Sequence, residues 1–455
     1  MLSRTQLIDP DKAWAPYVPN DSWSPWTLSL VGHLYRRAAF GATYAELTST
    51  LEIGPQAAID RLIRPEGDLD AFEQEYDRYE EAASGKLQNM QAWWLRRMFN
   101  SPDPLREKLT LFWHEHFATG PHRNESSKPM HDNVALLRRH ALGSLDAMLP
   151  ELLRDPAFLL SRDADQNRKA APNDRYAAEI LRRVLGEDAN YTEVDVHEAA
   201  RALTGTFVYS EQTRFIPREF DEGEKTFLGA TGSFGTDDLI NVLLRQPEAS
   251  RNVVRGLYRL LISECVIPSD ELIQPLAEQF AVDYDIRALV ERMLRSNQFF
   301  SPSAYRCRVK SPVEYVVGFV RSMGQSVSTL NLSDELRRLG QELYNPPTLE
   351  GWPRGEQWLN SATVIGRANL AFDLLNGTKQ ITTNIDPHAL VEENGMTGSD
   401  ETARFFSDLF VQSDVDEQMI SELKTTVFSG RNEPNEEQIA AFVQGVVSAP
   451  EYHLS

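Results

Sequence analysis

The sequence has 455 residues, enough for a large buried core and for two or three domains of ~150 residues. Its composition, 41% hydrophobic and 25% charged, is typical of globular proteins and excludes long disordered stretches. The formal net charge of -21 excludes a nucleic-acid-binding protein, because such a field repels phosphates. It favours solubility, a cationic partner or bound metal ions.

The first 25 residues predict a segment that wraps over the surface of the protein. Residues 1–10 lack the apolar core of a signal peptide, and residues 14–26 are rich in Trp and Pro. No run in the chain approaches the ~20 apolar residues that a membrane span needs. We therefore expect a cytoplasmic protein, or one that is exported together with a partner.

A main helical domain is expected from residue 26 to residue 376. Thr43 and Glu46 have the spacing of a helix capping box, which predicts the start of one helix. Apolar residues at helical spacing predict further helices at 70–100, 104–116, 129–140, 145–154, 172–185 and 192–205.

One short β hairpin is predicted near residues 206–217, from the β-rich runs 206–209 and 214–216. The glycine-rich stretch 220–235 is expected to be a loop. It contains neither GxxxxGK[ST] nor GxGxxG, so it is not a nucleotide-binding loop.

Beyond the hairpin, helices are expected from 237 to 323 and, after a Pro/Gly/Trp-rich loop at 345–358, from 361 to 375. Residues 377–398 are the best linker candidate, and residues 399–455 are expected to form a C-terminal helical segment that packs on the main domain. The predicted fold class is mainly α: a multi-helical, irregular helical bundle with one small β hairpin.

His114 and His116 are candidate ligands of a divalent metal, because imidazole commonly binds such ions. Their spacing argues against one shared ion, since residues two apart on a helix point about 200° apart. His116 also lies on the apolar stripe of its helix with Leu109 and Phe112. A buried, hydrogen-bonded histidine is therefore the alternative.

Asp163, Asp165 and Asn167 form a second candidate metal site, whose spacing matches the first three ligands of a calcium loop. Arg168 stands at the sixth position, where such loops carry Gly, and Asp174 stands at the twelfth, where they carry Glu. The alternative is a solvated loop that caps the following helix.

Asn173, Tyr176 and Glu179 recur every three residues, so they share one face of a helix. Glu179 is a candidate general acid or base if it is buried near His33 or His116. The alternative is an ion pair with an arginine three or four residues further along the same helix.

Three further groups are candidates for ligand binding. Arg36 and Arg37 are suited to a carboxylate or phosphate, or to pairing with the acidic excess of the chain. Arg201 belongs to a row of charged residues that is more typical of salt bridges. Trp352 and Trp358 flank a loop where indole faces suit sugars or cations, unless the loop plugs the core.

Seven motifs, in order, resemble the bacterial domain of unknown function 1800 family. The resemblance runs from about residue 26 to the closing SAPEYHLS. It implies a mainly α-helical protein whose gene often neighbours one for a secreted, alkaline-phosphatase-like protein. The motifs are HLYRRAAFG (33–41), FWHEHFATG (112–120), QNRKAAPNDRYAAE (166–179), YTEVDVHEAARALTG (191–205), GEKTFLGATGSF (223–234), KSPVEYVVG (310–318) and GWPRGEQWLNSAT (351–363, within 346–369).

One departure from the family pattern concerns the helix at 172–185. Ala178 and Arg182 stand where relatives usually carry Arg and a second Glu. A family site that needs this second carboxylate is therefore not expected here in the same form.

Two functions remain open at this point. The first is a binding, scaffold or export partner of the phosphatase-like protein, because no complete catalytic motif occurs. The second is a metal- or acid/base-dependent hydrolase acting on a polysaccharide or its modified sugars. It would use His33, His116 and Glu179, with Trp352 as a platform.

Overall fold

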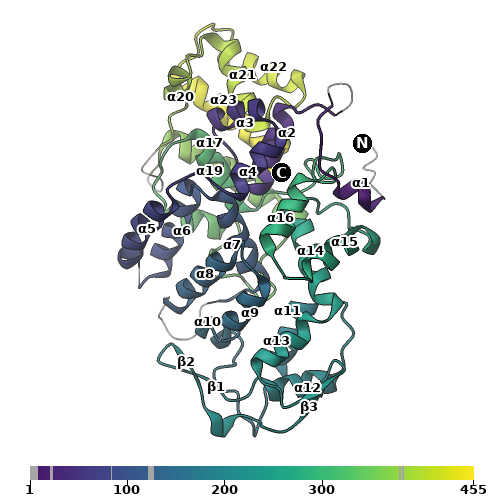
Figure 1. Cartoon of the computed structure of the whole chain (residues 1–455). Helices are drawn as coiled ribbons and strands as arrows, with labels where there is room; N and C mark the ends of the chain where they lie inside the picture. Colours follow the sequence, from purple (N-terminus) through teal and green to yellow (C-terminus); the bar gives the residue numbers. More distant parts are fainter. Residues whose placement is uncertain (1–8, 21–23, 84, 121–127, 379–380, 382–383) are drawn as a thin grey trace.

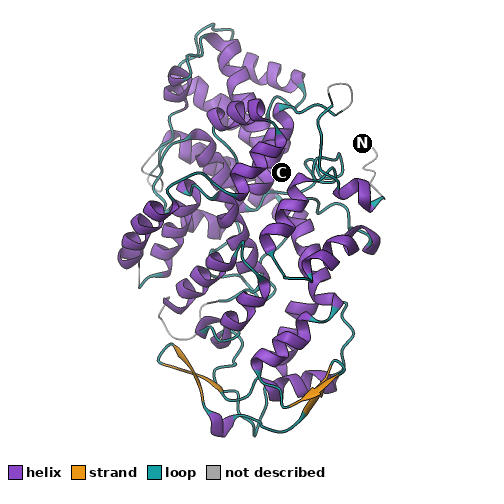
Figure 2. Ribbon diagram, viewed as in Figure 1, coloured by secondary structure: helices purple, strands orange, loops and turns teal. Residues whose placement is uncertain are grey.

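The computed structural model of the chain describes residues 9–20, 24–83, 85–120, 128–378, 381 and 384–455. It is 60% helical, with 23 α-helices and two small two-stranded antiparallel sheets among the described residues (Figure 2). The predicted mainly α fold class is confirmed. In the same residues, no helix has both the length and the apolar character needed to cross a membrane.

The first third of the chain surrounds α7 with other helices. α7 packs against α2, α4, α6 and α8. Its Leu105, Leu109 and Trp113 are fully buried. The helices are α1 (Pro10–Trp14), α2 (Leu28–Ala38), α3 (Tyr44–Ile53), α4 (Pro55–Ile63), α5 (Leu69–Ala83), α6 (Leu87–Asn100), α7 (Pro104–His116), α8 (Lys128–His140), α9 (Leu145–Leu152) and α10 (Pro156–Leu160).

Local signals set several of these boundaries, and two expectations need correction. The capping box of Thr43 and Glu46 is present at α3. The predicted helix 70–100 is two helices, because Gly85 between them has a φ of +110° that a helix does not allow. The predicted wrapping segment contains α1, which Asp9 caps, and Trp14 anchors it by donating a 2.6 Å hydrogen bond to Leu272.

The middle of the chain contains six helices and both hairpins. Helices α11 and α14 pack against each other, and α12 packs on α11. The elements are α11 (Asp174–Leu185), α12 (Glu193–Ala202), β1 (Thr206–Tyr209), β2 (Gln212–Phe215), β3 (Lys225–Phe227), β4 (Ala230–Gly232), α13 (Thr236–Leu244), α14 (Pro247–Leu261), α15 (Asp270–Phe280) and α16 (Ile286–Arg295), with a short 3-10 helix at Pro217–Glu219.

The predicted hairpin is confirmed, and a second one was missed. β1 pairs with β2 in the register Thr206 to Phe215. The stretch 220–235, expected to be a loop, contains the β3–β4 pair. These strands have three residues each, too few for an alternating pattern to be read from the sequence.

The last third of the chain ends in helices that pack on one another and on α2 and α3. The elements are α17 (Pro312–Met323), α18 (Leu332–Arg338), α19 (Ser361–Asn376), α20 (Pro387–Glu393), α21 (Gly398–Val411), α22 (Glu417–Phe428) and α23 (Glu436–Ser448), with 3-10 helices at Gly355–Trp358 and Pro450–His453. The predicted linker 377–398 is corrected in part, because it contains α20. Asp386 caps this helix, and it packs on α23.

Figure 1 shows how the segments are arranged. Helices α20–α23 gather at one end of the molecule beside α2 and α3, and the two hairpins lie at the other end. Between them α17 approaches the first helices very closely. A Cβ atom at Gly318 would lie 2.4 Å from the carbonyl oxygen of Phe40, so only glycine permits this approach. The approach brings the start of α17 beside α7.

Candidate functional site

His33 is enclosed within the protein interior. Its Nε2 lies 2.9 Å from the carbonyl oxygen of Phe299, and its ring packs on the rings of Phe299 and Tyr305. Burial, with the nearby charges of Arg37 and Arg36, holds the pKa of His33 well below its usual value. His33 therefore serves packing, and it does not line the cleft described below.

Arg36 and Arg37 are also buried, with exposed fractions of 7% and 0%. Arg37 donates a 2.7 Å hydrogen bond to the carbonyl oxygen of Ala304, and Arg36 donates to the side-chain oxygen of Gln412. Both guanidinium groups therefore lie inside the protein and donate to neighbouring parts of the chain, so binding of a carboxylate or phosphate by them stays a prediction.

His114 and His116 lie on different sides of α7, which runs unbroken through both. His114 is fully buried between the rings of Trp94 and Trp352, and neither ring nitrogen has a hydrogen-bond partner among the described residues. Burial lowers the pKa of His114 to about 3. The two imidazoles do not form a shared metal site. In the described ranges, no group of three or more His, Cys, Asp or Glu residues is placed to hold an ion.

The suggested calcium loop is a structural loop. The Asp163 carboxylate faces Arg175 at 3.5 Å, and the backbone carbonyl of Asp165 accepts a hydrogen bond from Val208. Asn167 is buried and its side-chain oxygen accepts from the backbone N–H of Asn173. Asp163 and Asn167 thus contact different partners, and the loop supports the following helix through Asn167.

Glu179 forms the ion pairs that its helix spacing allows. Its carboxylate lies 2.6 Å from Arg182 and 2.7 Å from Arg183. Burial raises its pKa, but hydrogen bonds from Arg183 and Arg182 outweigh burial, so the pKa is lowered. The expected meeting of Glu179 with His33 and His116 is wrong, and the ion-pair interpretation holds. On the same helix Asn173 is the N-cap of α11, and Tyr176 is buried.

The remaining candidates differ in their surroundings. Arg201 pairs with Glu198 and Asp221, each at 2.8 Å. Trp352 and Trp358 are only 4% and 5% exposed. Trp352 packs on the ring of His114 in the helical core, whereas Trp358 lines the cleft described below.

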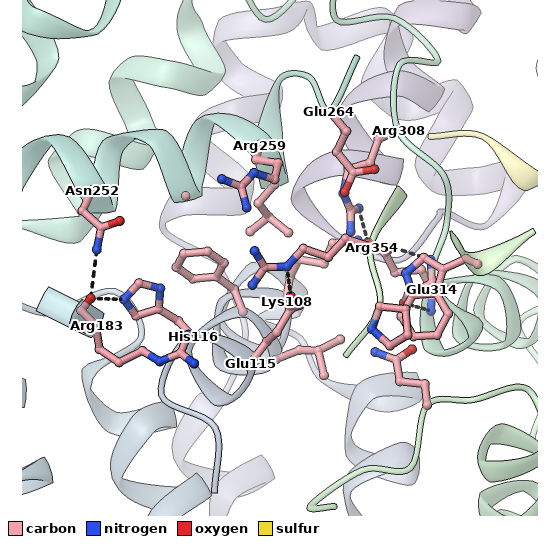
Figure 3. A pocket seen from close by; sticks show the side chains of 18 of the residues that line it. Lys108, Glu115, His116, Arg183, Asn252, Arg259, Glu264, Arg308, Glu314 and Arg354 are labelled. Atoms are coloured by element: carbon pink, nitrogen blue, oxygen red, sulfur yellow. Dashed lines mark hydrogen bonds and ion pairs between the residues drawn. The ribbon is translucent and has the colours of Figure 1, made fainter. Parts of the chain in front are cut away.

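A charged cleft lies beside α7, between α11, α14 and the loop before α19 (Figure 3). Its volume is about 200 Å³. Among its described lining residues basic side chains outnumber acidic ones, whereas the whole chain has 46 basic and 67 acidic residues. Positive charge is thus concentrated here. The charged lining residues are Lys108, Arg182, Arg183, Arg259, Arg308 and Arg354, with Glu115, Glu187, Glu264 and Glu314.

Glu314 anchors a buried ion-pair network at one end of the cleft. It lies in the first turn of α17, where it completes a capping box with Ser311. Its carboxylate pairs with Arg308 at 2.5 Å and with Lys108. Burial raises the pKa of Glu314, but these two cations outweigh burial and hold it far below its usual value. Burial also lowers the pKa of Lys108 to about 8.

Glu264 lies next to this network, but its carboxyl group is less completely paired than that of Glu314. Its carboxylate is 3.4 Å from Arg308, and its second oxygen is buried without a hydrogen-bond partner in the described part of the chain. Burial raises its pKa, and Glu314 adds to the rise. Two neighbouring carboxyls, Glu314 and Glu264, therefore have pKa values shifted in opposite directions.

Two arginines occupy the middle of the cleft (Figure 3). Arg354 pairs with Glu115. Arg259, from α14, is exposed, and it has neither a hydrogen bond nor an ion pair with any described residue. Arg259 is the cleft cation that remains available to a ligand.

His116 forms the other end of the cleft, as the last residue of α7. Its Nε2 lies 3.1 Å from the carbonyl oxygen of Arg183, which also accepts a 2.9 Å hydrogen bond from Asn252. Burial, followed by the charges of Arg183 and Arg354, lowers the pKa of His116 to about 3. The imidazole is therefore neutral at physiological pH.

Sequence reasoning found His116 and Trp358 and missed the charged residues that surround them. Glu314 stands within KSPVEYVVG, where its capping-box spacing was visible but its burial was not. Arg259 and Glu264 belong to no motif, and only the packing of α14 against α11 brings them toward α7.

The fold and the site together define a mainly helical protein with a buried ion-pair network beside a basic cleft. Residues 33–454 match the family described as "Protein of unknown function (DUF1800)", and the chain belongs to this family. No curated protein and no solved structure matches the chain.

Proposed function

We propose that the chain binds a small anionic ligand in the basic cleft. The observation that carries the proposal is Arg259, an exposed guanidinium in the middle of the cleft without a partner among the described residues. A planar guanidinium suits the two oxygens of a carboxylate or phosphate. The excess of basic residues around it offsets the repulsion expected from a chain of net charge -21.

The size of the cleft limits the ligand. Its volume of about 200 Å³ is below the ~300–1,000 Å³ of pockets that hold drug-sized molecules. A small metabolite, or the terminal unit of a polymer, fits this volume.

Replacing Arg259 with Gln should weaken binding of a small organic anion about 10- to 100-fold. A hydrogen bond to a charged group contributes about 1.5–3 kcal/mol, and 1.4 kcal/mol is tenfold in affinity. Isothermal titration calorimetry with glucuronate and with inorganic phosphate measures the effect.

Arg255→Gln is the matched control. Arg255 lies one turn earlier on α14 and pairs with Asp270 at 2.6 Å, outside the cleft. This variant should bind like the wild type. Equal losses in both variants, or no binding of either anion to the wild type, would count against the proposal.

A hydrolase acting on acidic or modified sugars is a second candidate. The opposed pKa shifts of Glu314 and Glu264 favour it, because pairs of carboxyls whose environments push their pKa values apart are typical of acid/base sites. Incubation with polygalacturonate, followed by a reducing-end assay, tests this function. Glu264→Gln should lower the rate at least ~100-fold while leaving binding intact. An unchanged rate argues against the acid role.

The expected partnership with a secreted alkaline-phosphatase-like protein concerns the outer surface of the chain. It stays a prediction, as does the expectation of a cytoplasmic location or of export with that partner. Co-purification of the two proteins is the direct test.

A further inference from the structure

The hydrogen bond of His116 fixes which ring nitrogen carries the proton. Nε2 lies 3.1 Å from the carbonyl oxygen of Arg183, and a carbonyl oxygen can only accept a hydrogen bond. Nε2 is therefore the protonated nitrogen of the neutral ring. The other nitrogen, Nδ1, has a lone pair and no proton, so it can only accept.

Nδ1 of His116 is available to a ligand. No described residue makes a hydrogen bond to this atom. In Figure 3, the edge of the ring that faces away from Arg183 points toward the middle of the cleft. Phe112 stacks on the imidazole, with ring centres 5.8 Å apart and planes at 26°, which holds the ring in this orientation. His116 thus presents one fixed acceptor.

The surroundings of His116 restrict the donor that can reach Nδ1. The charges of Arg183, Arg354 and Arg259 all act on this imidazole and lower its pKa. The same charges disfavour an ammonium donor at this place. An anion oxygen without a proton is disfavoured too, because it would set a lone pair against the lone pair of Nδ1. A neutral hydroxyl satisfies both conditions.

We infer that the ligand of this cleft is a hydroxylated organic acid of the sugar-acid class, with its carboxylate on Arg259 and one hydroxyl donating to His116 Nδ1. This inference rests on the proposed anion-binding function. It adds that the cleft selects for a hydroxyl beside the negative charge. A site built to hydrogen-bond a hydroxyl discriminates strongly against analogues that lack it.

Calorimetric titration of the wild-type chain with three probes tests the inference. Glucuronate has both groups, cyclohexanecarboxylate has the charge alone, and glucose has the hydroxyls alone. We expect glucuronate to bind up to about tenfold more tightly than cyclohexanecarboxylate, since one neutral hydrogen bond contributes up to about 1.5 kcal/mol, and about 10- to 100-fold more tightly than glucose, which lacks the charge. Equal binding of glucuronate and cyclohexanecarboxylate overturns the inference but leaves anion binding intact. No binding of any probe overturns both.

Variants of His116 then assign the selectivity to this residue. His116→Phe keeps a ring but has no acceptor, so it should bind glucuronate about tenfold more weakly and cyclohexanecarboxylate as before. His116→Gln supplies an amide N–H for the Arg183 carbonyl and an oxygen for the ligand, so it should retain most of the preference for glucuronate. The role of Nδ1 is overturned if His116→Phe keeps the full preference for glucuronate over cyclohexanecarboxylate. It is also overturned if His116→Gln loses as much of this preference as His116→Phe does.

Discussion

Replacing Glu314 with Gln should lower the free energy of unfolding by about 3–5 kcal/mol, the usual cost of removing one partner from a buried ion pair. Glu314 is 3% exposed, and its carboxylate pairs with Lys108 and Arg308, which are buried with it. Gln keeps the size and can still accept the Ser311 N–H, but it leaves two cations without their main counter-charge. Urea denaturation followed by circular dichroism at pH 7 measures the change.

Two further variants distinguish the destabilisation by Glu314→Gln from the effect of losing any one negative charge. Glu335→Gln removes a partly exposed ion pair with Arg338 on α18 and should change stability by less than about 1 kcal/mol. The double variant Glu314→Gln/Lys108→Met removes a stranded cation and should regain part of the loss. The prediction fails if Glu314→Gln is no worse than Glu335→Gln, or if the double variant loses the sum of both single changes.

The helical class and many boundaries could be predicted because their causes are local. The capping box at Thr43 and the prolines at helix starts act within a few residues of themselves. The β3–β4 hairpin escaped prediction because its three-residue strands carry too little pattern, and α20 because its glycine-rich surroundings resemble a linker.

The candidate site could be predicted only at His116 and Trp358. Motif reasoning favoured His33 and Glu179, whose helix positions were compatible with a shared site. The packing of α2 encloses His33 against Phe299, and arginines three and four residues away neutralise Glu179. Residues that do share the cleft come from separate segments, and no local spacing links Arg259 to His116. Their proximity is a tertiary property.

The departure from the family pattern at Arg182 acquires a physical meaning in the structure. The resemblance implies a second Glu at this position, and Arg182 lines the cleft here. Its guanidinium pairs with Glu179, Glu187 and Glu350, so it holds three carboxylates at the cleft wall.

Lowering the pH from 6.5 to 4.5 should cost the wild type about 2.5 kcal/mol of stability through His114 alone, at about 1.36 kcal/mol per pH unit. His114 is fully buried and its pKa is lowered to about 3, whereas an imidazole in the unfolded chain titrates near 6.5. Between these values the unfolded chain binds a proton that the folded chain does not. Stability therefore rises with pH across this window and is lost as the pH falls, and the lowered pKa of His116 acts in the same direction.

His114→Phe isolates this contribution. Neither ring nitrogen of His114 makes a hydrogen bond within the described chain, so replacing the imidazole should change stability by no more than about 1 kcal/mol at pH 7. At pH 4.5 the variant should be more stable than the wild type by about 2 kcal/mol, since phenylalanine has no proton to bind. Urea midpoints at the two pH values measure both differences.

The wild type and His114→Phe share every carboxylate pair, so acid effects at those pairs act equally on both chains and cancel in the difference between them. If stability depends on pH in the same way for the wild type and His114→Phe, then His114 has the same pKa in the folded and unfolded chains. That result would contradict a sealed, apolar environment for His114 between Trp94 and Trp352.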